Sequence, residues 1–450
     1  MSKKKTLSFL IVFLAVVPGV LTSVTPLLAA SKEKVLYTFN GADGNGPYAG
    51  LIFDASGNLY GTTYSGGAYG YGTAFQVSPG VNGNWSETIL HDFAFGADGV
   101  LPCAGLILDG KGNLYGTTKS GGVYGYGSVF QLSSGANGKW TEKLLHSFNN
   151  NDGLAPVAGL TFDAAGNLYG TTLYGGAYGY GTVFQLAPGA DGTWTETVLY
   201  SFAGGGTDGA SPYSGVVFDS AGNLYGTTFS GGAYGYGTVF EVKPGTHGTW
   251  SGKVLHSFGK GKNKDGINPY DGLVFDRAHK LYGTTYSGGA YGYGTIFELA
   301  LGAKGKWGEK VLHSFNKGKG GAYPYGGVLF DSAGNMYGTT YSGGAYGYGT
   351  VFRFSLAKNG KWIEKVLSSF NGNDGNGPDD DLIADARGNL YGTTQYGGGS
   401  GCGGSGCGTV FEIVLRQAPT GSSLLHSRKP IRVVDRRVTF GSLTPDGKFP

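Results

Sequence analysis

The stretch that decides the fold is Asn58-Leu-Tyr-Gly-Thr-Thr63, which recurs almost unchanged along the 450-residue chain. Only two copies vary: Lys280 replaces the asparagine in one, and Met336 replaces the leucine in another. The tyrosine of the motif stands at seven positions: Tyr60, Tyr115, Tyr169, Tyr225, Tyr282, Tyr337 and Tyr391. Seven copies at a spacing of roughly 55 residues indicate an array of equivalent supersecondary units.

Each unit contains four strand-like runs. In the first unit these are Gly50–Asp54, Asn58–Thr63, Thr73–Val77 and Trp85–Phe93, all rich in β-branched and aromatic residues and bounded by turn formers. We name them strands A to D in chain order. Four short antiparallel strands in a unit of about 55 residues are typical of a propeller blade. The sequence therefore predicts an all-β fold, a seven-bladed β-propeller.

The two ends of the repeat array are offset by one strand. A run that resembles strand D, Lys34–Phe39, precedes the first unit, whereas the seventh unit stops after its strand C, Thr409–Ile413. One strand is surplus at the start and the same strand is missing at the end. Pairing the two runs closes the ring and removes two exposed sheet edges, so we expect the N-terminal strand to complete the last blade.

The chain divides into three segments. Residues 1–30 are predicted to be a signal peptide, because three lysines (Lys3 to Lys5) precede an apolar run, Leu7–Val17; an uncleaved membrane anchor is the alternative. Residues 31–413 form the propeller, and the basic segment 414–450 is interpreted as a flexible or docking tail. We therefore expect a secreted, extracellular or cell-surface monomer of bacterial type, with the periplasm as an alternative, and no transmembrane segment after removal of the signal.

The charge distribution bears on the partners. The net charge of +3 comes from the two ends of the chain, so the propeller body between them is mildly acidic. Such a body lacks the basic surface that nucleic acid binding requires, and we expect no nucleic acid partner.

Two loop motifs fall on one face of the predicted ring, where the D–A and B–C loops emerge. The D–A loops carry Asp-Gly-Xaa-Xaa-Pro, beginning with Asp43 in the first copy, and Gly320 replaces the aspartate in the sixth. Six B–C loops carry Gly-Gly-Xaa-Tyr-Gly-Tyr-Gly and supply Tyr69, Tyr71, Tyr124, Tyr126, Tyr178, Tyr180, Tyr234, Tyr236, Tyr291, Tyr293, Tyr346 and Tyr348. Aromatic rings with interspersed carboxylates form a candidate platform for stacking sugars. The alternative is that alternate tyrosines pack between neighbouring blades.

Other repeated polar residues have structural interpretations. The aspartates that open the A–B turns, Asp54 and its six equivalents, are expected to accept turn N–H groups. His91, His146, His256 and His313 share a strand D position that holds Tyr37, Tyr200 or Ser368 in other copies. A position that accepts tyrosine or serine is not an obligatory metal or proton-transfer site.

The seventh unit breaks the pattern. Cys402 and Cys407 replace the tyrosine pair in a longer B–C loop, and in an exported chain we expect them to form a disulfide. The run Asp379-Asp380-Asp381 enters the innermost strand, where it either holds a cation such as calcium or lies in a solvated loop. Cys103 occupies a position that holds tyrosine or valine elsewhere, which favours a buried apolar thiol.

The chain resembles the GloVer-type tandem-repeat proteins, exported bacterial repeat proteins with interchangeable anchoring tails. The resemblance rests on the recurring Gly-Asn-Leu-Tyr-Gly-Thr-Thr and Gly-Gly-Xaa-Tyr-Gly-Tyr-Gly-Thr-Val-Phe phrases and covers residues 34–413. It implies export and a repeat scaffold, and it carries no assigned activity. Residues 414–450 depart from the family pattern because they contain no apolar sorting helix.

Three functional hypotheses follow. The preferred one is a non-catalytic propeller that binds a polysaccharide, peptide or protein partner through the tyrosine-rich face, without a cofactor. The second is an enzyme of hydrolase, lyase or quinoprotein type with its site at the channel mouth. Enzymes need unlike groups in separate roles, and nearly every polar residue here is repeated, so no catalytic residue is assigned. The third is a structural surface or matrix component.

Overall fold

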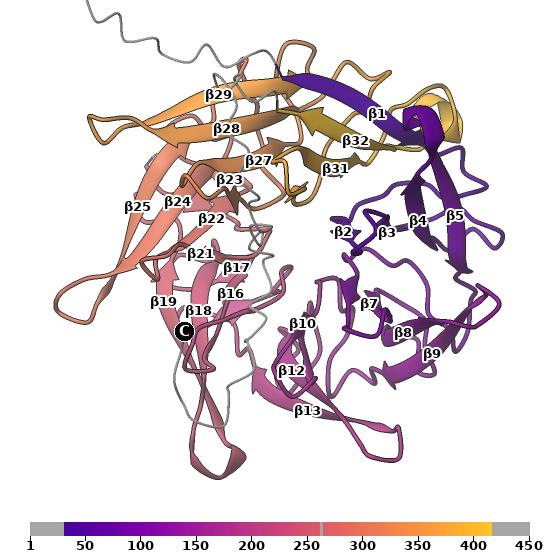
Figure 1. Cartoon of the computed structure of the whole chain (residues 1–450). Helices are drawn as coiled ribbons and strands as arrows, with labels where there is room; N and C mark the ends of the chain where they lie inside the picture. The colour runs from indigo at the N-terminus through magenta and orange to yellow at the C-terminus, as the bar shows by residue number, and fades with distance from the viewer. Residues whose placement is uncertain (1–30, 262–263, 416–450) are drawn as a thin grey trace, which may run out of the picture.

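Seven four-stranded antiparallel sheets are arranged in a ring in the computed structural model (Figure 1). It describes residues 31–261 and 264–415. The predicted signal peptide and almost all of the basic tail lie outside these residues. The predicted seven-bladed propeller is confirmed. No helix in the described part of the chain is long and apolar enough to cross a membrane.

Every blade has the same strand order from the channel outward. Blade 1 comprises β2 (Ile52–Phe53), β3 (Leu59–Thr63), β4 (Thr73–Pro79) and β5 (Trp85–Asp92). Blade 2 comprises β6 (Ile107–Leu108), β7 (Leu114–Thr118), β8 (Ser128–Ser134) and β9 (Trp140–Ser147). Blade 3 comprises β10 (Thr161–Phe162), β11 (Leu168–Thr172), β12 (Thr182–Pro188) and β13 (Trp194–Ser201). Blade 4 comprises β15 (Val217–Phe218), β16 (Leu224–Thr228), β18 (Thr238–Pro244) and β19 (Trp250–Ser257).

Blade 5 comprises β21 (Val274–Phe275), β22 (Leu281–Thr285), β24 (Thr295–Leu301) and β25 (Trp307–Ser314). Blade 6 comprises β26 (Leu329–Phe330), β27 (Met336–Thr340), β28 (Thr350–Leu356) and β29 (Trp362–Ser369). Blade 7 completes the ring with β30 (Ile383–Ala384), β31 (Leu390–Thr394), β32 (Thr409–Val414) and β1 (Lys32–Thr38). Two short pairs lie in the loops: β14 (Gly209–Ala210) with β17 (Ser230–Gly231), and β20 (Gly266–Ile267) with β23 (Ser287–Gly288).

The innermost strands are shorter than the sequence predicts. Strand β2 pairs over Ile52 and Phe53 alone, whereas the expected run was Gly50–Asp54. Asp54 leaves the ladder because its Oδ1 accepts the N–H groups of Ser56 and Asn58 at 2.8 and 2.9 Å, and its Oδ2 accepts the Tyr60 hydroxyl at 3.1 Å. The turn aspartate is therefore structural, as predicted.

The glycine of the repeat allows the blades to pack. A Cβ on Gly61 would lie 2.6 Å from Cζ of Phe75, so only glycine admits this phenylalanine ring over strand β3. The Phe75 ring in turn contacts Phe39, which follows the outer strand of the neighbouring blade, with ring centroids 5.0 Å apart. The same contact occurs at all seven blade boundaries, at 5.0 to 5.5 Å.

The two threonines of the repeat also have separate roles. Thr62 donates its hydroxyl to the backbone oxygen of Ala104 in the next blade, at 3.1 Å. Each of the other six copies makes the same bond to its neighbour, at 2.8 to 3.3 Å. Thr63 bonds the Thr73 hydroxyl of strand β4 within its own blade, at 2.8 Å. The motif thus ties each blade to itself and to the next.

The ring closes as the sequence predicts. Strand β1 pairs antiparallel with β32, from Lys32 opposite Val414 to Thr38 opposite Thr409. In Figure 1 the indigo N-terminal strand lies beside the yellow C-terminal strand. The register shifts between Val35 and Tyr37, as it does at the matching position of every other blade. The N-terminal strand therefore replaces a strand D in pairing and in register.

This closure gives a first prediction. A chain that starts at residue 42 lacks β1 and Phe39, so its melting temperature should fall well below that of a chain that starts at residue 31. The point variant Phe39→Ala should lose about 3 kcal/mol of unfolding free energy, because the ring is 3% exposed. Phe95→Ala is the control, since this ring is 79% exposed. Equal melting temperatures for the two chain starts would contradict the closure.

A second prediction concerns pH. Glu87 lies half-buried on β5, and burial, with added repulsion from Asp43 and Asp92, raises its pKa to about 7. Folding therefore favours the protonated carboxyl. The resulting destabilisation is absent below the unfolded pKa near 4.5, grows as the pH rises, and is complete above pH 7.

Glu87→Gln should remove this destabilisation. We expect the variant to match the parent at pH 4.5 and to exceed its unfolding free energy by roughly 1 kcal/mol at pH 8, a value reduced for solvent screening at this half-exposed position. Denaturant titrations at the two pH values measure the difference. A gain of the same size at both pH values would show that ionisation is not its cause.

Candidate functional site

The predicted tyrosines lie on the surface of the loop face. Eleven of the twelve are between 38% and 63% exposed, and Tyr293 is half-buried. In every pair the second tyrosine is less exposed than the first, which is the direction expected if alternate tyrosines pack against a neighbouring loop, as Tyr236 does beside Gly259. The glycines explain the exposure of the rings: Gly66 has φ +81° and a Cβ there would lie 2.5 Å from the Gly41 oxygen, so backbone fills the space between the loops and the rings point outward.

Two of the D–A loop aspartates, Asp43 and Asp265, are buried rather than exposed on the loop face. Asp43 is 8% exposed and accepts the Tyr37 hydroxyl at 2.6 Å and the Asn40 N–H at 2.9 Å, and Asp265 is 6% exposed. These side chains are turned between the blades because they hold the D–A loop to the end of strand D. Asp43 and Asp265 are thus not interspersed among the exposed tyrosines, whereas the loop aspartates of the other blades are partly exposed.

A cavity of about 670 Å³ occupies the centre of the ring. Its wall includes the residue that follows the proline of each D–A loop, one from every blade: Tyr48, Cys103, Val157, Tyr213, Tyr270, Tyr325 and Asp379. Unlike the loop tyrosines, this set varies from blade to blade. The channel wall is thus where the repeat carries unlike side chains close together.

A chain of aromatic contacts leads from this wall to the loop face. Its consecutive ring centroids are 4.6 to 5.5 Å apart. The rings follow one another in the order Tyr213, Tyr270, Tyr325, Tyr286, Tyr323 and Tyr293. The last of these belongs to a B–C loop. The tyrosine-rich face and the channel cavity are therefore joined by one aromatic surface across blades 4 to 6.

Asp379 is the acidic member of the channel ring. Its Oδ1 has essentially no accessible surface and no hydrogen-bond partner among the described residues. Burial raises its pKa well above the usual range, and repulsion from Asp380 and Asp271 adds to the effect. The Asp379 carboxyl can therefore stay protonated at a pH where most carboxyls are ionised.

Three further carboxylates converge beside it. Oxygens of Asp271, Asp380 and Asp381 lie within 4.8 Å of one another. Backbone N–H groups hold them: Gly50 N–H donates to Asp380 Oδ2, and Gly327 N–H donates to Asp271 Oδ2 and, at 2.8 Å, to Asp381 Oδ1. Sequence reasoning missed Asp271. It stands one residue after Tyr270, at the position of Asp380 in blade 7, whereas the other five blades have alanine, serine or glycine there; that alignment could have found it.

The remaining channel groups differ in chemistry. Cys103 is half-buried on the wall, and burial raises the pKa of its thiol to about 12. It is therefore an unreactive thiol, although it faces the cavity and is less buried than the sequence suggests. Lys119 also lines the cavity and lies 5.8 Å from the centre of the Tyr64 ring.

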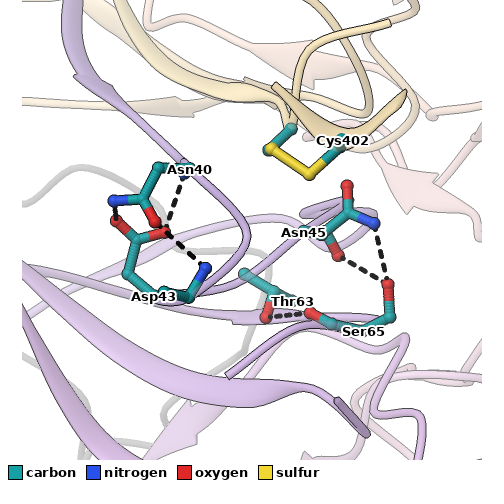
Figure 2. The surroundings of a disulfide bond; sticks show 8 residues. Asn40, Asp43, Asn45, Thr63, Ser65 and Cys402 are labelled. Atoms are coloured by element: carbon teal, nitrogen blue, oxygen red, sulfur yellow. Dashed lines mark hydrogen bonds between the residues drawn. A yellow bond between two sulfur atoms is a disulfide. The ribbon is translucent and has the colours of Figure 1, made fainter. Parts of the chain in front are cut away.

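The predicted disulfide forms at the seam of the ring. Cys402 and Cys407 are bonded, and Cys407 is 1% exposed. Gly46 N–H donates to the Cys407 oxygen at 3.0 Å, and a Cβ on Gly41 would lie 3.3 Å from Cys402 Sγ. Figure 2 shows Asn40, Asp43 and Asn45 of the first D–A loop beside Cys402. The cysteine loop therefore braces the segment that connects β1 to blade 1.

The repeat matches a known family of repeat proteins. The model of the Gloeobacter/Verrucomicrobia repeat matches residues 16–217 and 191–411. No curated protein matches the chain.

Two solved structures have a similar chain path. One is a protein from Thermus thermophilus assigned as an oxidoreductase (glucose dehydrogenase): it is 15% identical, with 86% of this chain and 100% of that chain covered and a TM-score of 0.40. The other is a protein of unknown function from Dyadobacter fermentans: it is 10% identical, with 85% and 98% covered and a TM-score of 0.41.

The family model matches most of the chain, and the same repeat motifs build all seven blades. The chain therefore belongs to the Gloeobacter/Verrucomicrobia repeat family.

Proposed function

We propose that this protein is an exported binding propeller for a polysaccharide, which it holds in the channel cavity and over the tyrosine-rich face. The observation that carries the proposal is the unbroken aromatic path from Tyr213 in the channel to Tyr293 on the loop face. A sugar ring has an apolar face that packs on a tyrosine ring and hydroxyls that donate to carboxylates. Asp379 and the neighbouring carboxylates stand at the channel end of that path.

The repetition of the loop tyrosines supports a polymer as ligand. Six nearly identical loops present the same pair of rings around the face. Weak contacts of this kind add up when one chain engages several loops, which raises the overall affinity without a strong single site. A small monosaccharide gains nothing from this arrangement.

The disulfide supports export. Cys402 and Cys407 are bonded at the ring seam, and such bonds persist in oxidising compartments outside the cytoplasm. This agrees with the signal peptide predicted for residues 1–30.

One observation favours the enzyme hypothesis as a second candidate. Asp379 has a raised pKa, while Asp271, Asp380 and Asp381 lie beside it. Two neighbouring carboxyl groups, one acting as acid and the other as base or nucleophile, are the usual pair in glycoside cleavage. Product analysis after incubation with a bound polysaccharide separates the two candidates, because a binding protein leaves the chain length unchanged.

A third prediction tests the tyrosine-rich face. The variant with alanine at Tyr69, Tyr124, Tyr178, Tyr234, Tyr291 and Tyr346 should lose at least about tenfold in apparent affinity for the polysaccharide that the parent selects on a glycan array, because six stacking contacts are removed. Val81→Ala/Leu301→Ala is the control, since both side chains are exposed and their strand C–D turns emerge on the opposite face. Absence of glycan binding by the parent, or equal binding by the six-fold variant, would contradict the proposal.

A fourth prediction concerns calcium. We propose that the run Asp379 to Asp381 holds one calcium ion together with Asp271. Oxygens of Asp271, Asp380 and Asp381 lie within 4.8 Å of one another, Asp379 stands beside them, and calcium takes oxygen ligands. Calorimetry with calcium chloride should give a binding heat with the parent that is absent from Asp379→Asn/Asp381→Asn. Flat traces for both proteins would remove calcium from the site.

A further inference from the structure

A second type of polar cluster recurs between the blades, away from the channel. Each cluster joins the last part of one blade's strand D, the first residue of the following D–A loop motif, and a strand D residue of the next blade. Between blades 2 and 3 these are His146, Asp152 and Glu196; between blades 4 and 5 they are His256, Asp265 and Glu309. We name these two sets the 2–3 cluster and the 4–5 cluster.

The ligand atoms of both clusters converge, and the histidine makes no hydrogen bond to the aspartate. In each, one atom from every residue lies within 4.8 Å of the other two. The distance from His Nε2 to the Asp Oδ2 is 3.3 Å in the 2–3 cluster and 3.6 Å in the 4–5 cluster. Two ligands at a tetrahedral angle on a zinc ion, each about 2.0–2.1 Å from the metal, are about 3.3 Å apart. The spacing therefore fits a shared metal ion better than a hydrogen bond.

Several of these atoms lack a partner although they are shielded from water. His146 Nε2 and Glu196 Oε1 in the 2–3 cluster have no hydrogen bond within the described chain. The same holds for His256 Nε2, Asp265 Oδ1 and Glu309 Oε1 in the 4–5 cluster, where Asp265 is only 6% exposed. An unsatisfied buried polar group costs about 1–3 kcal/mol. The 2–3 cluster has two such atoms and the 4–5 cluster has three, and an ion held between the residues would satisfy them.

Other blade boundaries show the same position in a closed form. Tyr37 and Tyr200 donate to Asp43 and Asp208 at 2.6 and 2.9 Å. His91 Nε2 lies 2.9 Å from Asp98 Oδ1, which is a hydrogen bond.

At the boundary between blades 5 and 6, His313 faces Glu364 at 3.7 Å, but Gly320 replaces the aspartate, so this set has one ligand fewer. A complete His, Asp and Glu set occurs at three boundaries, since Glu142 lies beside His91 and Asp98. The His91–Asp98 bond closes one of these sets, and the 2–3 and 4–5 clusters are open.

We infer that the 2–3 cluster and the 4–5 cluster each bind one divalent transition-metal ion, with zinc as the best fit, and so cross-link adjacent blades. One imidazole and two carboxylates suit zinc, whereas calcium prefers oxygen ligands alone. Three protein ligands leave the fourth position of the ion to water. From the sequence, this histidine position is interpreted as structural, because other copies have tyrosine or serine there. For His146 and His256 we propose a metal-binding role instead.

The chain supplies matched variants for the test. His146→Tyr and His256→Tyr reproduce the tyrosine that the chain itself has at Tyr37 and Tyr200, so they should fold. His313→Tyr makes the same change at the boundary that lacks the aspartate. The full chain, prepared without a histidine tag and stripped with a chelator, is dialysed against zinc chloride and analysed for bound metal.

We expect two zinc ions per parent chain, one in each of His146→Tyr and His256→Tyr, none at these sites in the double variant, and two in His313→Tyr. The melting temperature of the parent should rise with zinc, and that of the double variant should not. Less than about a tenth of an equivalent bound to the parent, or an equal loss of metal in His313→Tyr, would overturn the inference. Neither result bears on polysaccharide binding at the channel.

Discussion

The structure depends on one contact, in which a phenylalanine lies over the glycine of the repeat and meets a second phenylalanine from the neighbouring blade. Gly61 leaves room for Phe75, and Phe75 meets Phe39 at a centroid distance of 5.0 Å. A side chain at the glycine would push the ring outward and separate the blades at that level. Because the same pair recurs at every boundary, blades can differ at other positions without losing their alignment. The closing boundary uses the same pair, so the ring needs no special device beyond the offset of its first strand.

Side chains can therefore vary at positions outside that contact, and the candidate functional residues lie at such positions. The residue after each loop proline faces the channel and ranges from Tyr48 to Cys103 to Asp379. The closing blade varies most: it has the aspartate run in the channel and the bonded cysteines at the seam. Residues that are repeated in every blade build the scaffold, and residues that differ from the repeat indicate a candidate site.

Sequence period and strand offset were enough to predict seven blades and the pairing of β1 with β32, because both follow from counting equivalent residues. The channel cluster was only half predicted. Asp379 to Asp381 are adjacent in the chain, whereas Asp271 reaches them from blade 5, past the small residues of blade 6: a Cβ on Gly326 would lie 2.6 Å from the Asp380 backbone. A period gives the order of blades but not which side chains meet across a narrow channel. The outward direction of Tyr69 was also beyond the sequence, since it depends on how the left-handed glycines fold the loop.

The position at the end of strand D shows how the same blade packing accommodates different polar side chains. Facing it, near the start of the next blade's strand D, a half-buried glutamate recurs whose Oε1 has no hydrogen bond, as in Glu87 and Glu142, so the packing carries a repeated electrostatic cost. Where tyrosine faces the aspartate, a neutral hydroxyl satisfies it and the glutamate is left alone. Where histidine faces it, the imidazole either bonds the aspartate, as His91 does, or stands apart, as His256 does at 3.6 Å. A cation between the separated groups would offset the charge of both carboxylates at once. The phenylalanine contact maintains the blade spacing in either case, which explains why a boundary can keep an open cluster of unpaired polar atoms without collapsing on it.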